Sequence, residues 1–143
     1  MINKLQISAL MVLDQEQALD FYVNKLGLEV ANDIKQGPVR WLTVRVPGDP
    51  DHEIYLQLPA PPALDEGTAA QVRELVSKGA IGFVAFITED CRALYETLRS
   101  RGVEDFTQEP TDHFYGVDMG VRDPFGNHIR ILQPAKREAP SGA

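Results

Sequence analysis

Short apolar stretches follow one another along the chain, and turn-forming residues separate them. Residues 5–13 are largely apolar and prone to extended structure, which is typical of a buried strand. A helical pattern follows, with Ala18 and Phe21 on one face, a capping residue, Asp14, before it, and Gly27 after it. The chain therefore begins with a predicted strand and a predicted amphipathic helix.

The same patterns assign the rest of the chain. Residues 47–51 and 110–115 have the composition of loops, and the Pro-Ala-Pro-Pro stretch at residues 59–62 interrupts regular structure. The predicted strands span residues 5–13, 28–34, 39–46, 52–58, 82–88, 106–108, 116–121 and 128–132, and the predicted helices span residues 15–25, 68–78 and 90–101. We expect residues 135–143 to form a flexible polar tail.

The most informative turn is Asp-Pro-Phe-Gly-Asn at residues 123–127. Proline favours an early turn position, and glycine and asparagine tolerate the positive φ angles that tight turns require. Because strand patterns flank this stretch, it predicts a hairpin. Alternation along the second strand then places His128 and Arg130 on one face of the sheet and Ile129 and Ile131 on the other.

The second half of the chain repeats the pattern of the first half at an offset of seventy-five positions. The matching segments are residues 18–19 with 93–94, 26–28 with 101–103, and 54–56 with 129–131, and Pro59 corresponds to Pro134. Each half is predicted to form a βαβββ unit, which alone leaves one face of its sheet uncovered. The predicted fold is therefore α+β, with paired βαβββ modules that form a curled mixed sheet around a central cleft. We expect one domain over residues 1–134, with modules at residues 1–62 and 80–134 and a helical linker at residues 63–79.

Composition and charge narrow the classes of function. The chain has 143 residues, 43% of them hydrophobic, and its 21 acidic and 14 basic side chains give a net charge of −7. This balance argues against nucleic-acid binding, which requires clustered Lys and Arg. No apolar run approaches the roughly 20 residues of a membrane-spanning helix, and the first residues lack a secretory signal pattern. With a single cysteine, Cys91, we expect a cytoplasmic protein that binds neither nucleic acid nor membrane.

Several of these segments resemble those of the vicinal oxygen chelate superfamily, which includes glyoxalase I, the extradiol dioxygenases and the bleomycin-resistance proteins. The similar segments are Ala-Leu-Asp-Phe-Tyr at residues 18–22, Leu-Gly-Leu at 26–28, Leu-Arg-Ser-Arg-Gly-Val at 98–103 and Asp-Pro-Phe-Gly-Asn at 123–127. With the strand spacing, the resemblance covers residues 5–134. It implies a homodimer with a small-molecule cleft, and it leaves the activity open because the superfamily supports several chemistries.

The resemblance also implies where a metal ion would be bound in the metal-dependent members. The corresponding positions are Ile7, Phe83 and Arg130, together with Tyr55 or Gln57. Isoleucine and phenylalanine offer no lone pair, and a guanidinium is a permanent cation without an acceptor. We therefore expect no metal centre and no other cofactor, so the metal-dependent glyoxalase and dioxygenase mechanisms do not transfer.

Eight residues form the predicted site, in an apolar cleft with a few polar groups, as is usual for small-molecule pockets. The predicted ligand-binding residues are Trp41, Tyr55, Gln57, Phe83, His113, Tyr115, His128 and Arg130. The aromatic residues could stack on a planar ligand, or they could fill the core. Arg130 could bind a carboxylate or phosphate of the ligand, or it could pair with an internal acid. His113 and Tyr115 could contact a ligand or act as acid and base, or lie in an exposed loop.

Two functions remain open at this point. The first is a non-enzymatic protein that binds a planar or aromatic small molecule, similar to the bleomycin-resistance proteins. The second is a lyase, isomerase or dioxygenase that uses a displaced metal ion or the acid–base groups of His113, Tyr115 or His128.

Overall fold

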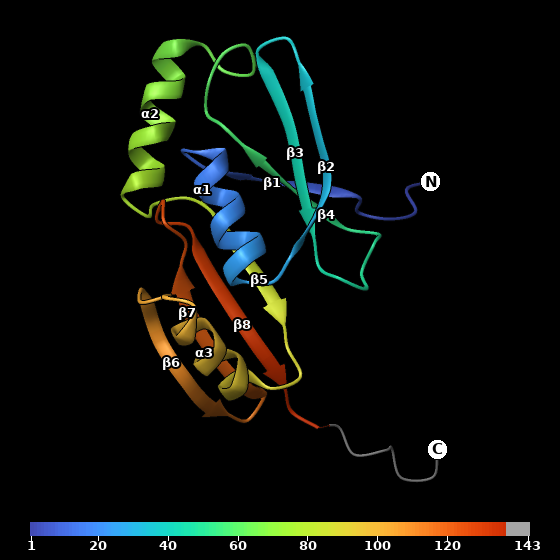
Figure 1. The fold of residues 1–143 in the computed structure, drawn as a ribbon, viewed down its shortest axis with the longest axis vertical. Coiled ribbons are helices and arrows are strands. Elements are labelled where there is room, and N and C mark those ends of the chain that lie inside the picture. The colour runs from blue at the N-terminus through green and yellow to red at the C-terminus, as the bar shows by residue number, and fades with distance from the viewer. Residues whose placement is uncertain (137–143) are drawn as a thin grey trace. The chain divides into compact units, whose positions relative to one another are not determined.

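The computed structural model describes residues 1–136, so most of the predicted tail at residues 135–143 lies outside the described residues. Along the chain, the elements form two βαβββ modules joined by a helix (Figure 1). The first comprises β1 (Ile7–Met11), α1 (Gln15–Leu19), η1 (Asp20–Lys25), β2 (Glu29–Gln36), β3 (Val39–Arg45) and β4 (Glu53–Gln57). After α2 (Glu66–Ser77), the second comprises β5 (Phe83–Ile87), α3 (Cys91–Ser100), β6 (Phe106–His113), β7 (Gly116–Arg122) and β8 (His128–Pro134). The predicted α+β class with repeated βαβββ modules is confirmed.

The contacts divide the chain into two compact units that do not coincide with the modules. The first unit holds Met1–Phe83 and also Asp123–Asn127, and the second holds Val84–Arg122 together with the strand that begins at His128. A short segment late in the sequence therefore completes the first unit. The assignment of residues 1–134 to one domain stays a prediction.

The first unit contains a four-stranded sheet in the order β1-β4-β3-β2. β1 runs parallel to β4, and the other neighbouring strands are antiparallel. Side chains on one face form the buried core with α1 and η1, since helix and strand each bury one apolar side. The core of this unit includes Leu10, Ala18, Phe21, Tyr22, Leu42, Val44, Ile54 and Leu56.

The helix predicted at residues 15–25 is present, but its second half is a π-helix. It begins after Asp14, whose Oδ1 accepts a hydrogen bond from the Gln17 amide at 2.9 Å. η1 continues α1 for six residues. The chain then leaves the helix through Gly27, which has a φ of 87°, a conformation that favours glycine.

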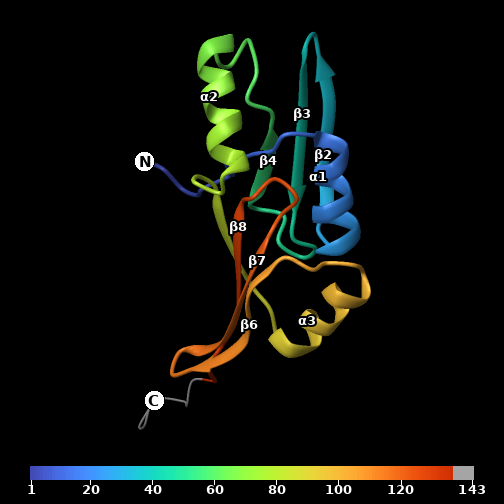
Figure 2. The ribbon, with the colours of Figure 1, turned by 90° about the vertical axis from the view of Figure 1, so that its left-hand side faces the viewer.

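The second unit contains a four-stranded sheet in the order β5-β8-β7-β6, and α3 packs against its strands (Figure 2). The predicted loop at residues 110–115 is wrong, because β6 continues as a strand to His113. Two register irregularities interrupt its pairing with β7, yet the pair closes with His113 opposite Gly116. Pro110 is tolerated because β6 is an edge strand, where a missing amide donor breaks no ladder on the open side.

The predicted turn at residues 123–127 is present and belongs to the first unit. Asp123 is 3% exposed, and its Oδ1 accepts hydrogen bonds from the backbone amides of Phe125, Gly126 and Asn127 at 2.9–3.0 Å. Its Oδ2 accepts from the Tyr22 hydroxyl at 2.6 Å and from Asn127 Nδ2 at 2.7 Å. Five donors to one carboxylate therefore join the turn to the helical segment of the first module.

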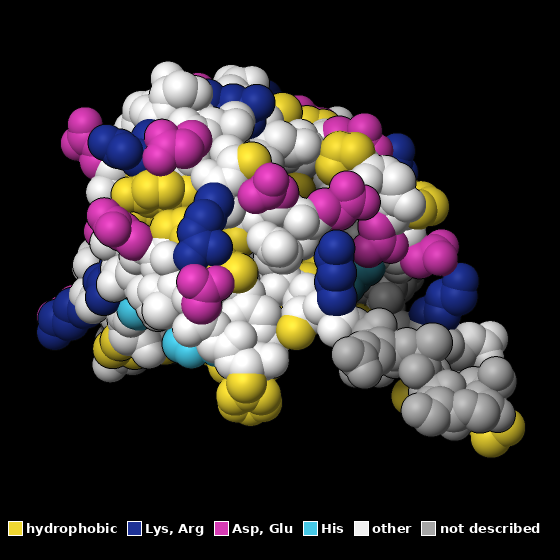
Figure 3. Space-filling view, turned by 90° about the horizontal axis from the view of Figure 1, so that it is seen from below, with side chains coloured by type: hydrophobic (Ala, Val, Ile, Leu, Met, Phe, Trp, Pro, Cys, Tyr) yellow, Lys and Arg dark blue, Asp and Glu magenta, His cyan; other side chains and the backbone are white. Residues whose placement is uncertain are grey.

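The helices of the described residues include none long and apolar enough to cross a membrane. On the face shown in Figure 3, acidic and basic side chains are interspersed, and no large basic patch dominates it. This distribution agrees with the acidic composition of the chain.

Candidate functional site

The predicted site residues fall into two groups, one in each unit. Trp41, Tyr55 and Gln57 lie on the sheet of the first unit. In the second unit His113 and Arg130 lie on strands, and Tyr115 lies in the turn between β6 and β7. Each group has its own geometry. Trp41, Tyr55 and Arg130 alternate with buried strand neighbours, so they point to the face of their sheet opposite the buried core.

An aromatic pair dominates the uncovered face of the first sheet. The rings of Trp41 on β3 and Tyr55 on β4 lie with their centroids 4.3 Å apart and their planes inclined by 32°. Both side chains are half-buried, so each keeps part of its ring surface accessible. Burial raises the pKa of Tyr55 and is the only cause of that shift. At this distance the two rings stack on each other, so a planar ligand could stack on the outer face of the pair.

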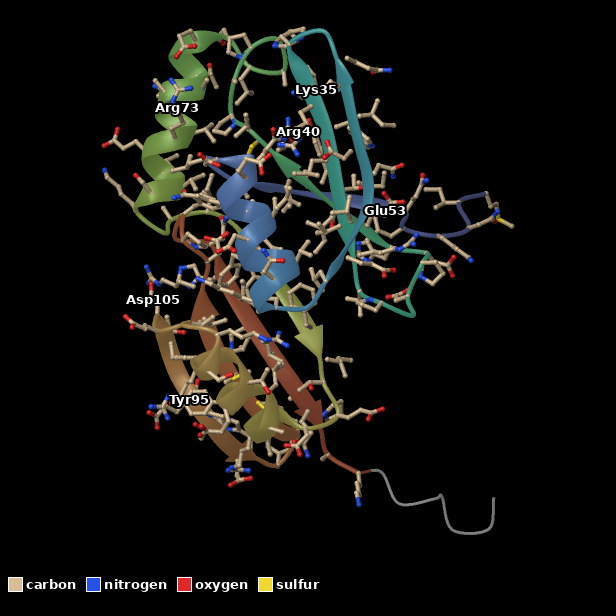
Figure 4. The ribbon with its side chains drawn as sticks, in the orientation of Figure 1. Lys35, Arg40, Glu53, Arg73, Tyr95 and Asp105 are labelled. Carbon is tan, nitrogen blue, oxygen red and sulfur yellow. The ribbon has the colours of Figure 1, made fainter. Side chains whose placement is uncertain are left out.

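A polar group lies on the same face. Glu53 precedes Tyr55 by two positions on β4, so both side chains point to one side of the sheet. Glu53 Oε1 accepts a hydrogen bond from Thr43 Oγ1 at 2.6 Å and another from Asn32 Nδ2 at 2.9 Å. Asn32 Nδ2 also lies 3.2 Å from Thr43 Oγ1. These contacts fix the Glu53 carboxylate two positions before Tyr55 on β4, and Figure 4 labels Glu53.

A hollow of about 90 Å³ opens next to the aromatic pair at the end of β4. Its lining residues are Gln15, Pro38, Val39, Arg40, Tyr55, Gln57, Leu58, Ala60, Pro61, Pro62 and Ala63. Since one ordered water needs only roughly 10–15 Å³ of such space, the hollow accepts a substituent of several heavy atoms. Prolines form much of its wall and restrict backbone motion there.

Arg40 contributes to the hollow but is committed to acidic partners. Its Nε and Nη2 donate to the two oxygens of Asp33 at 2.9 Å each, and its Nη1 donates to Glu16 Oε1 at 2.6 Å. These bonds raise the pKa of Arg40 and lower that of Asp33. The Arg40 side chain, which Figure 4 labels, is therefore held in place by Asp33 and Glu16 where it lines the hollow.

In the second unit, Asp118 is the centre of the polar group. It is 8% exposed, and Arg130 Nη2 donates to its Oδ2 at 2.5 Å. His113 Nε2 lies 3.0 Å from its Oδ1, and the Tyr115 hydroxyl lies 3.3 Å from its Oδ2. The rings of His113 and Tyr115 stack with centroids 4.7 Å apart. Arg130 therefore pairs with an internal acid, Asp118, which was the alternative to binding an anionic group of a ligand.

The electrostatics of this group follow from its contacts. Desolvation raises the pKa of Asp118, but the hydrogen bond and charge of Arg130, with smaller contributions from His113 and Tyr115, outweigh it, so the pKa is lowered. Desolvation and the neighbouring Asp118 carboxylate raise the pKa of Tyr115. Asp118 is therefore a carboxylate, and Tyr115 a neutral hydroxyl, at neutral pH.

Gly120 lies opposite Arg130 in the pairing of β7 with β8 and has no side chain to obstruct it. A Cβ at this position would fall 2.5 Å from Arg130 Nη1 and 2.3 Å from Thr107 Oγ1. The glycine therefore leaves room for the guanidinium, which reaches both Asp118 and Gln108, the latter at 2.9 Å.

The two remaining predicted residues each begin a strand. Phe83 begins β5 and is 66% exposed, so it is not core filler in the first unit. His128 begins β8 and is half-buried. Among the residues that the structure describes, no group of three or more His, Cys, Asp or Glu side chains could hold a metal ion.

Glu53, Thr43 and Asn32 are absent from the predicted site. The alternation of Glu53 with Tyr55 along β4 was a signal that places both on one face. The position of Asn32 was not readable in this way, because a register shift separates Val30 from Asn32 in the pairing of β2 with β3.

Comparison with known proteins gives consistent matches over nearly the whole chain. A family model described as the Glyoxalase/Bleomycin resistance protein/Dioxygenase superfamily matches residues 4–131. The chain is 33% identical to the protein YurT of Bacillus subtilis (strain 168) over 131 residues, which are 91% of this chain and 98% of YurT.

Solved structures match as well. The crystal structure of UcmS2 has 42% sequence identity and a TM-score of 0.86, over 93% of this chain and 99% of UcmS2. The structure of TnmS3, described as an antibiotic binding protein from Streptomyces sp. CB03234, has 28% identity and a TM-score of 0.74, over 94% of this chain and 98% of TnmS3.

Proposed function

The chain belongs to the Glyoxalase/Bleomycin resistance protein/Dioxygenase superfamily, and from this premise we propose that it binds a planar or aromatic small molecule without a metal ion and without converting it. The observation that carries this proposal is the Trp41–Tyr55 pair, with centroids 4.3 Å apart, beside a hollow at the end of β4. The rings would stack on the planar part of the ligand, and the hollow would receive a substituent. TnmS3 supports the proposal as a similar protein described as antibiotic binding.

The residues at the positions of the family's metal ligands support a role without a metal ion. Ile7 and Phe83 have apolar side chains, and Arg130 is a cation already paired with Asp118 at 2.5 Å. A guanidinium at a ligand position repels a divalent cation, by several kcal/mol at the effective dielectric of a partly buried site, as an order of magnitude. These residues do not fit a divalent ion, and we derive no step through one.

The predicted residues of the second unit are a separate proposal. We propose that Arg130, His113, Tyr115 and His128 contact polar groups of a small molecule. Arg130 is held by hydrogen bonds from Nη2 to Asp118 and Gln108, which preorganise it for an acceptor group of the ligand. The Asp118 carboxylate offsets its charge, so a fully anionic ligand would gain less from Arg130 than from an unpaired guanidinium.

We further propose a cytoplasmic homodimer. Phe83 and Ile87 on the edge strand β5 are 66% and 75% exposed, which is unusual for large apolar side chains on one face of a strand. A second copy of the chain would cover them. Analytical ultracentrifugation tests this proposal, because Phe83→Lys should shift a dimer towards monomer, while a wild-type protein that sediments as a monomer contradicts it.

The binding proposal is tested through the single tryptophan. Since Trp41 is the one tryptophan of the chain, its emission should be quenched when acridine, a planar heterocycle that absorbs in the range of tryptophan emission, stacks on it. Calorimetric titration then compares Trp41→Ala with Tyr95→Ala, which removes a ring of α3 in the other unit. We expect Trp41→Ala alone to weaken acridine by about tenfold or more, as the loss of one stacking contact of about 1–1.5 kcal/mol or more implies. Equal binding by both variants contradicts the proposal.

A second candidate function is an enzyme of the lyase, isomerase or dioxygenase type. The observation that favours it is the His113–Asp118 contact at 3.0 Å beside the Tyr115 hydroxyl, since a carboxylate that orients a histidine is a common part of acid–base sites. Two measurements separate the candidates. Stoichiometric Zn, Ni, Mn or Fe in the purified protein, or a bound ligand recovered with a changed mass, would favour the enzyme.

A further inference from the structure

The Glu53 carboxylate is oriented by neutral donors alone. Both hydrogen bonds end on Oε1, one from Thr43 at 2.6 Å and one from Asn32 at 2.9 Å. Thr43 is fully buried, so its hydroxyl is fixed by packing. Within the described residues no donor reaches Oε2. One oxygen thus anchors the side chain, and the other remains available to a ligand.

Glu53 has no ion-pair partner within residues 1–136, the part of the chain that the structure describes. No Lys, Arg or His of those residues lies within 4.0 Å of its carboxylate oxygens. The nearest cation by strand register is Arg45 on β3, and its Nε donates to Glu29 at 2.8 Å. The carboxylates of Glu53 and Glu29 and the single guanidinium of Arg45 leave this part of the face with an excess negative charge.

The fixed charge lies next to the stacking surface. The Cα atoms of residues two positions apart on a strand are separated by about 6.5–7 Å. Glu53 and Tyr55 on β4 have this spacing. A planar ring on Trp41 and Tyr55 would carry its substituents over this carboxylate. A protonated amine there gains a charge-assisted hydrogen bond to Oε2 and a favourable interaction with the aromatic faces.

We infer that the face of the first sheet selects planar ligands that carry a protonated amine, with Glu53 as the residue that recognises the ammonium group. This inference rests on the proposed binding function and adds the charge of the ligand to it. Asn32 and Thr43 act as positioning residues, because they touch Glu53 and orient its carboxylate. The net charge of −7 favours approach of the same ligands.

The experiment uses three acridines that differ in one substituent: 9-(aminomethyl)acridine, 9-(hydroxymethyl)acridine and acridine-9-carboxylate. Binding to the full chain is followed by calorimetry and by quenching of Trp41 emission. We expect the wild-type protein to prefer the amine over the alcohol by about tenfold or more, as a hydrogen bond between charged groups provides, and to bind the carboxylate most weakly. Glu53→Gln should remove the preference for the amine over the alcohol, because it removes the negative charge that the ammonium group pairs with.

Matched variants separate the local charge from the charge of the whole chain. Glu74→Gln on α2 removes the same charge from a surface pair with Lys78 and should keep the preference. Thr43→Val should weaken the preference by less than Glu53→Gln does. It leaves the charge of Glu53 in place and removes only the hydrogen bond that orients the carboxylate.

The outcomes are distinguishable. If the alcohol and the amine bind equally well to the wild-type protein, or if Glu53→Gln keeps the preference, ligand stacking stands and the assignment of Glu53 is wrong. If none of the three acridines binds, the proposed function fails and the inference fails with it.

Discussion

The hydrogen bond between the Tyr22 hydroxyl and Asp123 gives a prediction that can be worked out from the structure. Tyr22 is fully buried and Asp123 is 3% exposed, and their oxygens lie 2.6 Å apart. A hydrogen bond to a buried charged group contributes about 1.5–3 kcal/mol. Because Asn127 Nδ2 also donates to the same oxygen at 2.7 Å, we place Tyr22→Phe at about 2 kcal/mol of destabilisation, towards the lower part of that range.

Urea unfolding followed by Trp41 emission measures this loss, because Trp41 lies in the same unit as Tyr22 and Asp123. With a typical dependence of about 2 kcal/mol per molar urea, the midpoint should fall by about 1 M. The matched control is Tyr55→Phe in the same unit, where burial alone shifts the pKa of the hydroxyl. We expect this variant to remain within about 0.5 kcal/mol of the wild type.

The same bond predicts a dependence on alkaline pH. Burial, followed by the charge and hydrogen bond of Asp123, raises the pKa of Tyr22 well above its ordinary value. In the unfolded chain Tyr22 ionises near pH 10, whereas the folded protein keeps it neutral. Its contribution to stability is therefore complete below about pH 10 and is lost as the pH rises beyond that value. Tyr22→Phe should be less sensitive to alkali than the wild type. If Tyr22→Phe and Tyr55→Phe unfold at the same urea concentration and show the same alkaline loss, the reasoning is refuted.

Three further predictions concern other contacts. Arg130→Met should reduce stability at neutral pH and make stability less sensitive to acid. The lowered pKa of Asp118 contributes stability that is complete above about pH 3.9 and is lost as the pH falls through the pKa of Asp118 in the folded protein. Unfolding followed by circular dichroism at pH 7 and pH 3 compares the two proteins, and an equal loss of stability between these pH values contradicts the prediction. Gly82→Ala should cost about 2 kcal/mol or more, because φ is 93° and the new Cβ would fall 1.9 Å from Asn127 Oδ1; thermal unfolding measures it, and an unchanged midpoint refutes it. Trp41→Phe should keep more of the affinity for acridine than Trp41→Ala in calorimetry, since a ring remains available for stacking.

The local features of the fold were predictable from the sequence because their causes are local. Asp14 and Gly27 mark the ends of the first helical segment through capping and a positive φ. The Asp-Pro-Phe-Gly-Asn turn follows from backbone preferences of proline, glycine and asparagine. The alternation that places Trp41 and Tyr55 on the uncovered face is likewise a property of single strands.

The features that were missed depend on pairing between strands. β6 extends to His113 because β7 supplies its hydrogen bonds, although the composition of residues 110–115 indicates a loop. The Arg130–Asp118 contact depends on the register of β8 with β7, which sets Gly120 opposite Arg130. The Asn32–Glu53 contact spans three strands of the first sheet. No sequence pattern in a single segment contains this information.

Because Asp123–Asn127 belongs to the first unit, that unit is not complete when its first eighty-three residues have been synthesised. On the ribosome, the Tyr22 hydroxyl and the main-chain oxygen of Met11, which accepts from Asn127 Nδ2 at 2.8 Å, have to wait for a segment made some forty residues later. A gene cut between the modules would therefore encode a first half without the Asp123 carboxylate that accepts from the Tyr22 hydroxyl.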